Sequence, residues 1–109
     1  MIDLVKNNVE RITELCKDHR VKALYVFGSA ARQSDFTATS DVDFLVQFNY
    51  PKHLSEKDVF EKVENKTSLA EKLTKLVNRK VDLIDEDFIK NKYLKYFINK
   101  ERKLIYGLS

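Results

Sequence analysis

The chain has 109 residues, of which 43% are hydrophobic and 34% are charged, and its formal net charge is +3. This composition excludes a disordered chain, and the length predicts one domain over residues 1–109. Its one cysteine, Cys16, excludes an intramolecular disulfide and a multi-cysteine metal site. No hydrophobic stretch is long enough to span a bilayer. We therefore expect a soluble, cytoplasmic domain.

The first half of the chain predicts two helices and two strands. Hydrophobic residues spaced three to four apart predict a helix over residues 2–18, with Cys16 on its buried face and His19 at the surface beyond it. The run Val21–Phe27 is rich in β-branched and aromatic residues and predicts a buried strand. A short helical turn around Ala30–Arg32 comes next. The alternating segment Asp41–Phe48 then predicts a second strand.

The second half begins with polar capping signals. Ser55 and Ser68 each precede an acidic residue by three positions, which predicts the starts of two helices. Asn78 is expected to end the second helix in a left-handed conformation. The segment Val81–Ile84 predicts a short strand, and Asp85 is expected to cap the helix that follows.

A last helix and strand complete the predicted fold. The helix is expected to bury a hydrophobic face made of Phe88, Tyr93, Leu94, Phe97 and Ile98. The segment Lys103–Tyr106 predicts an edge strand. This order of elements predicts an α/β (α+β) fold in which helices flank a small mixed β-sheet. Residues 90–103 hold six basic residues against Glu101 alone, which indicates either a solvated helix face or a surface for an acidic partner.

Two aspartates on the second predicted strand are the first sign of chemistry. Asp41 and Asp43 are two residues apart, so their side chains point to the same face of the sheet. Two neighbouring carboxylates repel each other unless a cation lies between them, and Mg²⁺ prefers such oxygen ligands. The alternative is that both aspartates simply coat the solvated face of a half-exposed strand.

Two further features could complete a phosphate-transfer site. Gly28 and Ser29 end a strand and open a short helix, where backbone can approach an anion closely, and Arg32 follows one turn later. The alternative is an ordinary turn with a surface arginine. Asp82 lies within a short hydrophobic strand, and on a strand next to Asp41 and Asp43 it would complete a trio of carboxylates able to hold two metal ions.

Three segments together resemble a known family: Gly28-Ser29-Ala30-Ala31-Arg32, Ser40-Asp41-Val42-Asp43-Phe44-Leu45-Val46 and Arg79-Lys80-Val81-Asp82-Leu83. They resemble the minimal nucleotidyltransferases (MNT domains, the MntA type of antitoxin) of the DNA polymerase β superfamily, in that family's order. The resemblance implies the nucleotidyltransferase fold and Mg²⁺-dependent transfer of AMP from ATP to a hydroxyl. By position, Asp41, Asp43 and Asp82 match the metal-binding and catalytic carboxylates. Gly28 and Ser29 match the triphosphate-holding turn, and Arg32 and Ser40 match assisting positions.

The resemblance also implies a partner. Proteins of this type act as antitoxins that adenylylate a tyrosine of a HEPN ribonuclease toxin, so we expect a HEPN-type partner and neither membrane nor direct DNA binding. Two differences from the common family pattern are Gln33, where a glycine is usual, and a spacer before Asp41 that is one residue longer. They leave open a binding-only antitoxin that blocks its partner sterically. A transferase for small aminoglycoside-like compounds is a third alternative.

Overall fold

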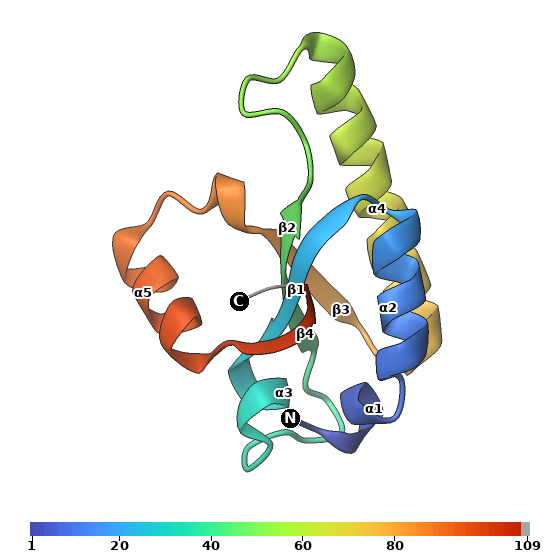
Figure 1. Cartoon of the computed structure of the whole chain (residues 1–109). Helices are drawn as coiled ribbons and strands as arrows, with labels where there is room; N and C mark the ends of the chain where they lie inside the picture. Colours follow the sequence, from blue (N-terminus) through green and yellow to red (C-terminus); the bar gives the residue numbers. More distant parts are fainter. Residues whose placement is uncertain (108–109) are drawn as a thin grey trace.

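The computed structural model describes residues 1–107 and places a four-stranded sheet between helices on both of its faces (Figure 1). The strands are β1 (Val21–Phe27), β2 (Val42–Phe48), β3 (Val81–Asp85) and β4 (Lys103–Gly107). The helices are α1 (Asp3–Lys6), α2 (Val9–Asp18), α3 (Gly28–Arg32), α4 (Glu56–Val77) and α5 (Lys92–Glu101), with the 3₁₀ turn η1 (Glu86–Phe88) before α5. No helix among the described residues is long and apolar enough to cross a membrane.

The sheet is mixed, as predicted, and its strand order is β3-β2-β1-β4. β1 runs antiparallel to both β2 and β4, whereas β3 runs parallel to β2. The helix α4 makes the crossover that a parallel pair requires. In this register Asp43 on β2 lies opposite Phe27 on β1 and opposite Asp82 on β3. The end of β1 and the starts of β2 and β3 therefore meet at one end of the sheet.

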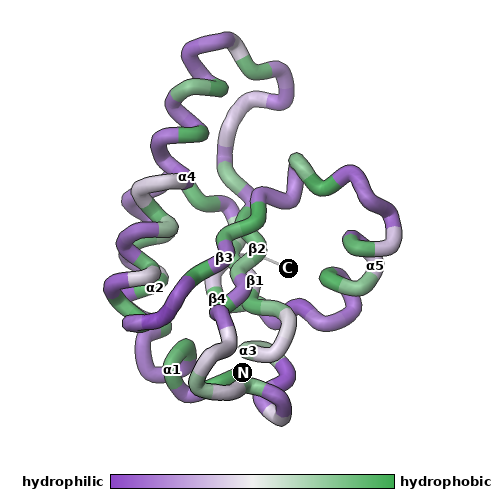
Figure 2. Tube along the Cα trace, turned by 180° about the vertical axis from the view of Figure 1, so that it is seen from behind, coloured by the Kyte–Doolittle hydropathy of each residue, from purple (hydrophilic) through white to green (hydrophobic). Residues whose placement is uncertain are grey.

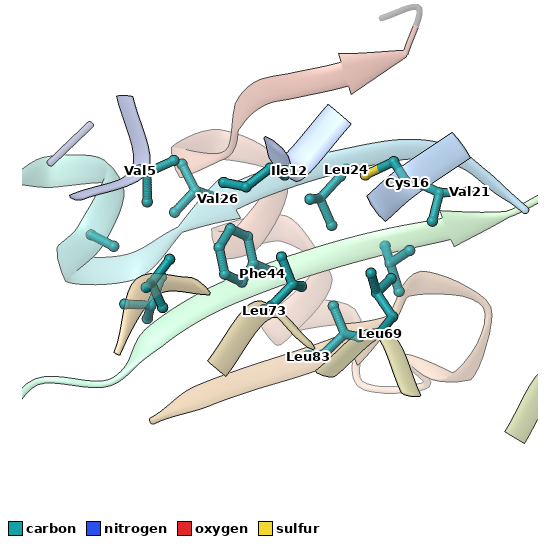
Figure 3. Close-up of a cluster of buried hydrophobic side chains, with 14 of the residues drawn as sticks. Val5, Ile12, Cys16, Val21, Leu24, Val26, Phe44, Leu69, Leu73 and Leu83 are labelled. Atoms are coloured by element: carbon teal, nitrogen blue, oxygen red, sulfur yellow. The ribbon is translucent and has the colours of Figure 1, made fainter. Parts of the chain in front are cut away.

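One face of the sheet carries the main hydrophobic core, which α2 and α4 cover (Figure 3). Phe44 of β2 and Leu69 and Leu73 of α4 are completely buried in it. Cys16 is also completely buried there, as predicted, and burial raises the pKa of its thiol to about 12. The predicted alternation of β2 is confirmed, because Val42, Phe44, Val46 and Phe48 all belong to this core.

The opposite face carries a smaller cluster and the helix α5. Tyr25, Phe27 and Leu45 of the sheet pack there against Ile98, the one buried residue of α5. The predicted burial of the other members of this face is wrong: Phe88, Tyr93, Leu94 and Phe97 are exposed. A polar network fills part of the space beneath the helix. In it, Arg102 pairs with Glu86 at 3.2 Å and its guanidinium lies over the ring of Tyr25. Glu86 also accepts a hydrogen bond from the side chain of Gln47.

Two predicted helix boundaries are wrong. The helix expected over residues 2–18 is interrupted between α1 and α2, where the Asn8 side chain donates a hydrogen bond to the carbonyl of Leu4. The helix expected to begin at Ser68 is part of α4, which runs without a break from the capping box formed by Ser55 and Asp58. The Ser68 hydroxyl instead lies 3.1 Å from Nε2 of His19, which is buried rather than at the surface.

The other capping predictions have a mixed outcome. Asn78 ends α4 in the left-handed conformation, with φ +52° and ψ +39°, as predicted. Asp85 caps η1 rather than α5, since its carboxylate accepts a hydrogen bond from the backbone of Asp87. The helix α5 begins later, and Asn91 caps it. Asp85 also forms a buried 3.0 Å ion pair with Lys62, which joins β3 to α4.

Candidate active site

Asp43 and Asp82 form the centre of the candidate site. They are paired residues on adjacent parallel strands, and strands in a sheet lie about 4.8 Å apart, so their side chains leave the same face next to each other. Asp43 is half-buried and Asp82 is exposed. Burial, together with the negative charges of Asp82 and Asp41, raises the pKa of Asp43 to about 6, although the positive charge of Arg32 opposes this rise. The site is therefore a place where negative charge is poorly compensated.

Asp41 lies just before β2, at the edge of this pair. Its carboxylate is 3.8 Å from the ammonium group of Lys80, a pair that is largely exposed to solvent. Asp41 is nevertheless close enough to Asp43 to raise the pKa of that carboxyl. The structure therefore brings the three predicted carboxylates into one electrostatic group.

Gly28 fits closely against this group. It follows Phe27 directly, and Phe27 pairs with Asp43. Its φ is +65°, a conformation that glycine adopts at little cost, and a Cβ at this position would lie 2.7 Å from Oδ2 of Asp43. The glycine is thus required twice, by the backbone turn and by the carboxylate beside it.

The three other predicted site residues, Ser29, Arg32 and Ser40, differ in how many hydrogen bonds and ion pairs their side chains make. The hydroxyl of Ser29 makes no hydrogen bond within residues 1–107, whereas its carbonyl accepts one from the backbone of Gln33 at 2.7 Å. Arg32 is held by two acidic partners, Asp35 at 2.8 Å and Glu101 at 2.7 Å. Its hydrogen bond to Asp35 keeps the pKa of that carboxyl below the usual range.

Ser40 stabilises the loop that leads into β2. Its hydroxyl accepts a hydrogen bond from the backbone of Thr37 at 2.9 Å. Arg79, which was not expected to be a site residue, also holds this loop. Its guanidinium donates to the carbonyls of Thr37 and Ser40 and lies 4.7 Å from the ring centre of Phe36. Its position in the sequence, three residues before Asp82 and close to the start of β3, could have indicated that Arg79 lies near the site.

The donor set fits a hard divalent cation by its chemistry. Three carboxylates with few compensating cations favour binding of an ion such as Mg²⁺, which would offset both the burial of Asp43 and the negative charges beside it that raise its pKa. As they stand, no three His, Cys, Asp or Glu side chains in residues 1–107 are gathered as a preformed metal site. An ion would therefore have to draw these carboxylates together, and Asp41 would have to leave Lys80.

The family comparison covers nearly the whole chain. Residues 10–109 match the model of the family described as Polymerase beta, Nucleotidyltransferase. A relative from Methanocaldococcus jannaschii, named "Putative protein adenylyltransferase MJ1379", is 35% identical over 94% of this chain and 93% of its own length. A second protein of the same organism, named "Putative protein adenylyltransferase MJ0126", is 38% identical over 85% of this chain and 83% of its own length.

Solved structures agree with this assignment. A structure described as a minimal nucleotidyltransferase superposes with a TM-score of 0.72 at 25% identity, over 94% of this chain and 95% of its own. An MNT antitoxin, solved in complex with a tri-AMPylated HEPN toxin from Shewanella oneidensis, gives a TM-score of 0.63 at 22% identity, over 94% of this chain and 72% of the solved one. The chain belongs to the polymerase β nucleotidyltransferase family and has the fold of its minimal members.

Proposed function

We propose that this chain transfers AMP from ATP to a hydroxyl group of a partner protein, a tyrosine of a HEPN-type toxin, and thereby acts as its antitoxin. The observation that carries the proposal is the pairing of Asp43 with Asp82 beside Gly28, at the one end of the sheet where three strands meet. The names of the Methanocaldococcus relatives support protein adenylylation. The AMPylated toxin solved with an MNT antitoxin supports the choice of partner.

The reaction assigns a separate task to each part of the site. The acceptor oxygen forms a bond to the α-phosphorus of ATP, the bond from that phosphorus to the bridging oxygen breaks, and pyrophosphate leaves. Asp82, the most exposed of the carboxylates, takes the proton of the acceptor hydroxyl. The turn at Gly28 and Ser29 admits the triphosphate, because glycine allows close backbone approach and the Ser29 hydroxyl is available as a donor.

Mg²⁺ is the cofactor that this donor set would hold. Asp41 and Asp43, with Asp82, would supply its carboxylate ligands, and two ions are the number expected for this chemistry. When bound, such ions neutralise phosphate charge and polarise the transferred group. Arg32 is placed to add a further positive charge, once an anionic ligand competes with Asp35 and Glu101 for its guanidinium. Residues 1–109 would together form the single catalytic domain of this activity.

A labelling experiment tests the proposal. The purified chain is mixed with Mg²⁺, ATP labelled at the α-phosphate and a candidate HEPN-type toxin protein. We expect label on the HEPN protein, and a loss of at least about 100-fold in rate for Asp43→Asn. Glu71→Gln, which removes an exposed carboxylate on α4, is the control and should label normally. Absence of label, or equal labelling by Asp43→Asn, would contradict the proposal.

The same variants separate catalysis from steric blocking. Neutralisation of the toxin in cells is measured for wild type, Asp43→Asn and Glu71→Gln at equal expression. If adenylylation is the mechanism, Asp43→Asn fails to protect while Glu71→Gln protects. Protection by Asp43→Asn at the wild-type level would favour the binding-only antitoxin instead.

A further inference from the structure

The helix α5 carries an exposed hydrophobic surface, which we call the α5 surface and define as Tyr93, Leu94, Tyr96 and Phe97. The side chain of Tyr93 is 79% exposed, and the other three residues are between 45% and 61% exposed. Figure 2 shows hydrophobic and hydrophilic residues alternating along this helix, which stands away from the sheet. A helix of ten residues that buries only Ile98 leaves most of its hydrophobic face without a partner among the described residues.

The position of the α5 surface relates it to the candidate active site. Ile98 packs against Tyr25, Phe27 and Leu45, so α5 lies on the same face of the sheet as Asp43 and Asp82. The last residue of α5, Glu101, pairs with Arg32 of α3 at 2.7 Å. This end of α5 therefore adjoins the helix that opens at Gly28. A protein that presents a hydroxyl to the carboxylates from this side would also reach α5.

The charge around the α5 surface indicates what kind of protein could cover it. Four exposed lysines lie within α5 or directly before it: Lys90, Lys92, Lys95 and Lys100. The two further basic residues of this segment lie elsewhere, because Arg102 pairs with Glu86 and Lys103 begins β4. The one acidic residue of this segment, Glu101, is already paired with Arg32. Lys100 lies 6.0 Å from the ring centre of Tyr96, so positive charge is interleaved with the aromatic residues rather than separated from them. A partner that buries these rings must supply negative charge around them.

We propose that the α5 surface is the docking site for the acceptor protein, through a patch on that protein with a hydrophobic centre and acidic residues around it. Tyr93, Tyr96 and Phe97 have the i, i+3, i+4 spacing of a helix that docks in a hydrophobic groove. Exposed tyrosines at such a position are typical anchors of protein interfaces. This proposal depends on the proposed function in one respect only, which is the identity of the partner.

A nucleic acid fits the α5 surface less well than a protein does. Bases stack on aromatic rings that offer an open face. Here Tyr96 and Phe97 pack edge to face against each other, with centroids 5.6 Å apart and an interplanar angle of 75°. Leu94 has no ring and can contribute only by hydrophobic burial. Both features suit a protein groove, which buries edges and aliphatic side chains as readily as ring faces.

A second hydrophobic surface of the chain provides the control. A groove of about 710 Å³ runs along α4, and its walls include Val59, Val63 and Phe88. The helix α4 covers the core face of the sheet, opposite to α5, so this groove does not lie beside the paired carboxylates. Phe60 and Val63 on α4 are 67% and 56% exposed, which matches the exposure of Tyr96 and Phe97.

Binding measurements with three double variants test the proposal. Tyr96→Ser with Phe97→Ser removes the hydrophobic anchors, and Lys95→Glu with Lys100→Glu reverses the charge. Phe60→Ser with Val63→Ser is the matched control on α4. Affinity for a candidate HEPN-type toxin protein is measured by calorimetry at two salt concentrations, and circular dichroism checks that each variant remains folded. We expect both α5 variants to bind at least about tenfold more weakly, the control to bind normally, and the charge effect to shrink at high salt.

The outcomes separate this proposal from the proposed function. If wild type binds and labels the partner and the α5 variants do both normally, the docking surface is overturned and adenylylation stands. If wild type binds through the α5 surface but transfers no label, the docking surface stands and adenylylation fails. Loss of binding to a single-stranded RNA oligonucleotide by the α5 variants, with partner affinity unchanged, would overturn the surface in favour of a nucleic acid. Absence of any partner binding by wild type would overturn both.

Discussion

The two faces of the sheet differ in what they leave exposed, although the same strands build both. On the side of α2 and α4, β2 contributes Phe44 and Val46, which are completely buried. On the side of α5, the intervening residues include Asp43, which is half-buried beside the exposed Asp82. Since side chains alternate along a strand, one segment can supply packing on one side and chemistry on the other. We therefore expect substitutions on the two faces to separate stability from activity.

The largest effect is expected on the packed face. Phe44→Ala should lower the free energy of unfolding by about 3–5 kcal/mol, because it removes a completely buried ring from the core. Leu94→Ala on α5 should change it by less than about 0.5 kcal/mol, since that side chain is 45% exposed. Urea unfolding of both variants measures the difference. Similar losses for the two would show that the faces contribute equally to stability.

Gly28, which lies beside Asp43, is expected to affect stability less than Phe44 does but to affect activity strongly. Gly28→Ala places a β-carbon 2.7 Å from the carboxylate of Asp43 in a left-handed conformation. We expect a stability loss of about 1–2 kcal/mol and a fall in the transfer rate of about 100-fold, because Asp43 must move. Ala31→Gly, in the same short helix, is the control.

The control destabilises the protein by about 1–2 kcal/mol, through lower helix propensity and the loss of a buried methyl group, without adding an atom beside Asp43. Unfolding curves and ATP titrations of both variants provide the comparison. If Gly28→Ala and Ala31→Gly affect ATP affinity equally, Gly28 is required only by the turn.

A gain in stability is expected at the end of α3. Gln33 has φ +74° and ψ −42°, a conformation that is unfavourable for any residue with a β-carbon. Gln33→Gly should raise the free energy of unfolding by about 0.5–1 kcal/mol, since relief of strain exceeds the entropic cost of glycine. Asn78→Gly should gain less, because asparagine tolerates the regular left-handed conformation found there. Thermal unfolding of the two variants tests the order, and a greater gain at Asn78 would contradict it.

An effect of pH is expected in protein freed of metal by a chelator. The pKa of Asp43 is raised from its ordinary 3.8 to about 6, so the protonated form favours the folded state. Its contribution to stability is present below about pH 4 and is lost as the pH rises through 6. Wild type should therefore lose stability relative to Asp43→Asn across this range in urea unfolding.

The opposite sign is expected for Asp35, which supplies the control. Arg32 lowers the pKa of Asp35, so this carboxylate stabilises the folded state above its ordinary pKa and that contribution is lost as the pH falls. Wild type should thus gain stability relative to Asp35→Asn as the pH rises from acid. A parallel trend for both pairs would contradict the raised pKa of Asp43.

The sequence predicted the strands well because their signal is local. β-Branched and alternating residues define β1 and β2, and Asn78 indicates the left-handed end of α4 without knowledge of the tertiary structure. Helix boundaries were less predictable. The hydrophobic period continues across Asn7 and Asn8, where the helix breaks, and the pattern at Ser68 suits a helix interior as well as a start.

The candidate site was predictable in its composition and less so in its geometry. Spacing along the chain placed Asp41 and Asp43 together, but their pairing with Asp82 depends on the parallel register of β2 and β3. Periodicity correctly marked a hydrophobic face on the last helix. It could not show that only Ile98 reaches the sheet, because a surface for a partner and a surface for a core have the same pattern in a sequence.

The contacts of Arg79 bear on how freely the loop before Asp41 can change in length. The guanidinium fixes the carbonyls of Thr37 and Ser40 to the start of β3, and the backbone of Val42 donates to the carbonyl of Lys80. The last residues of the loop are thus held by hydrogen bonds to residues 79 and 80, directly before β3, and their position does not depend on α3. Insertions or deletions between residues 33 and 36 would disturb the pair of Arg32 with Asp35 but would fall outside the contacts that hold the end of the loop. A reading frame that gains or loses a codon there can keep all three carboxylates in place.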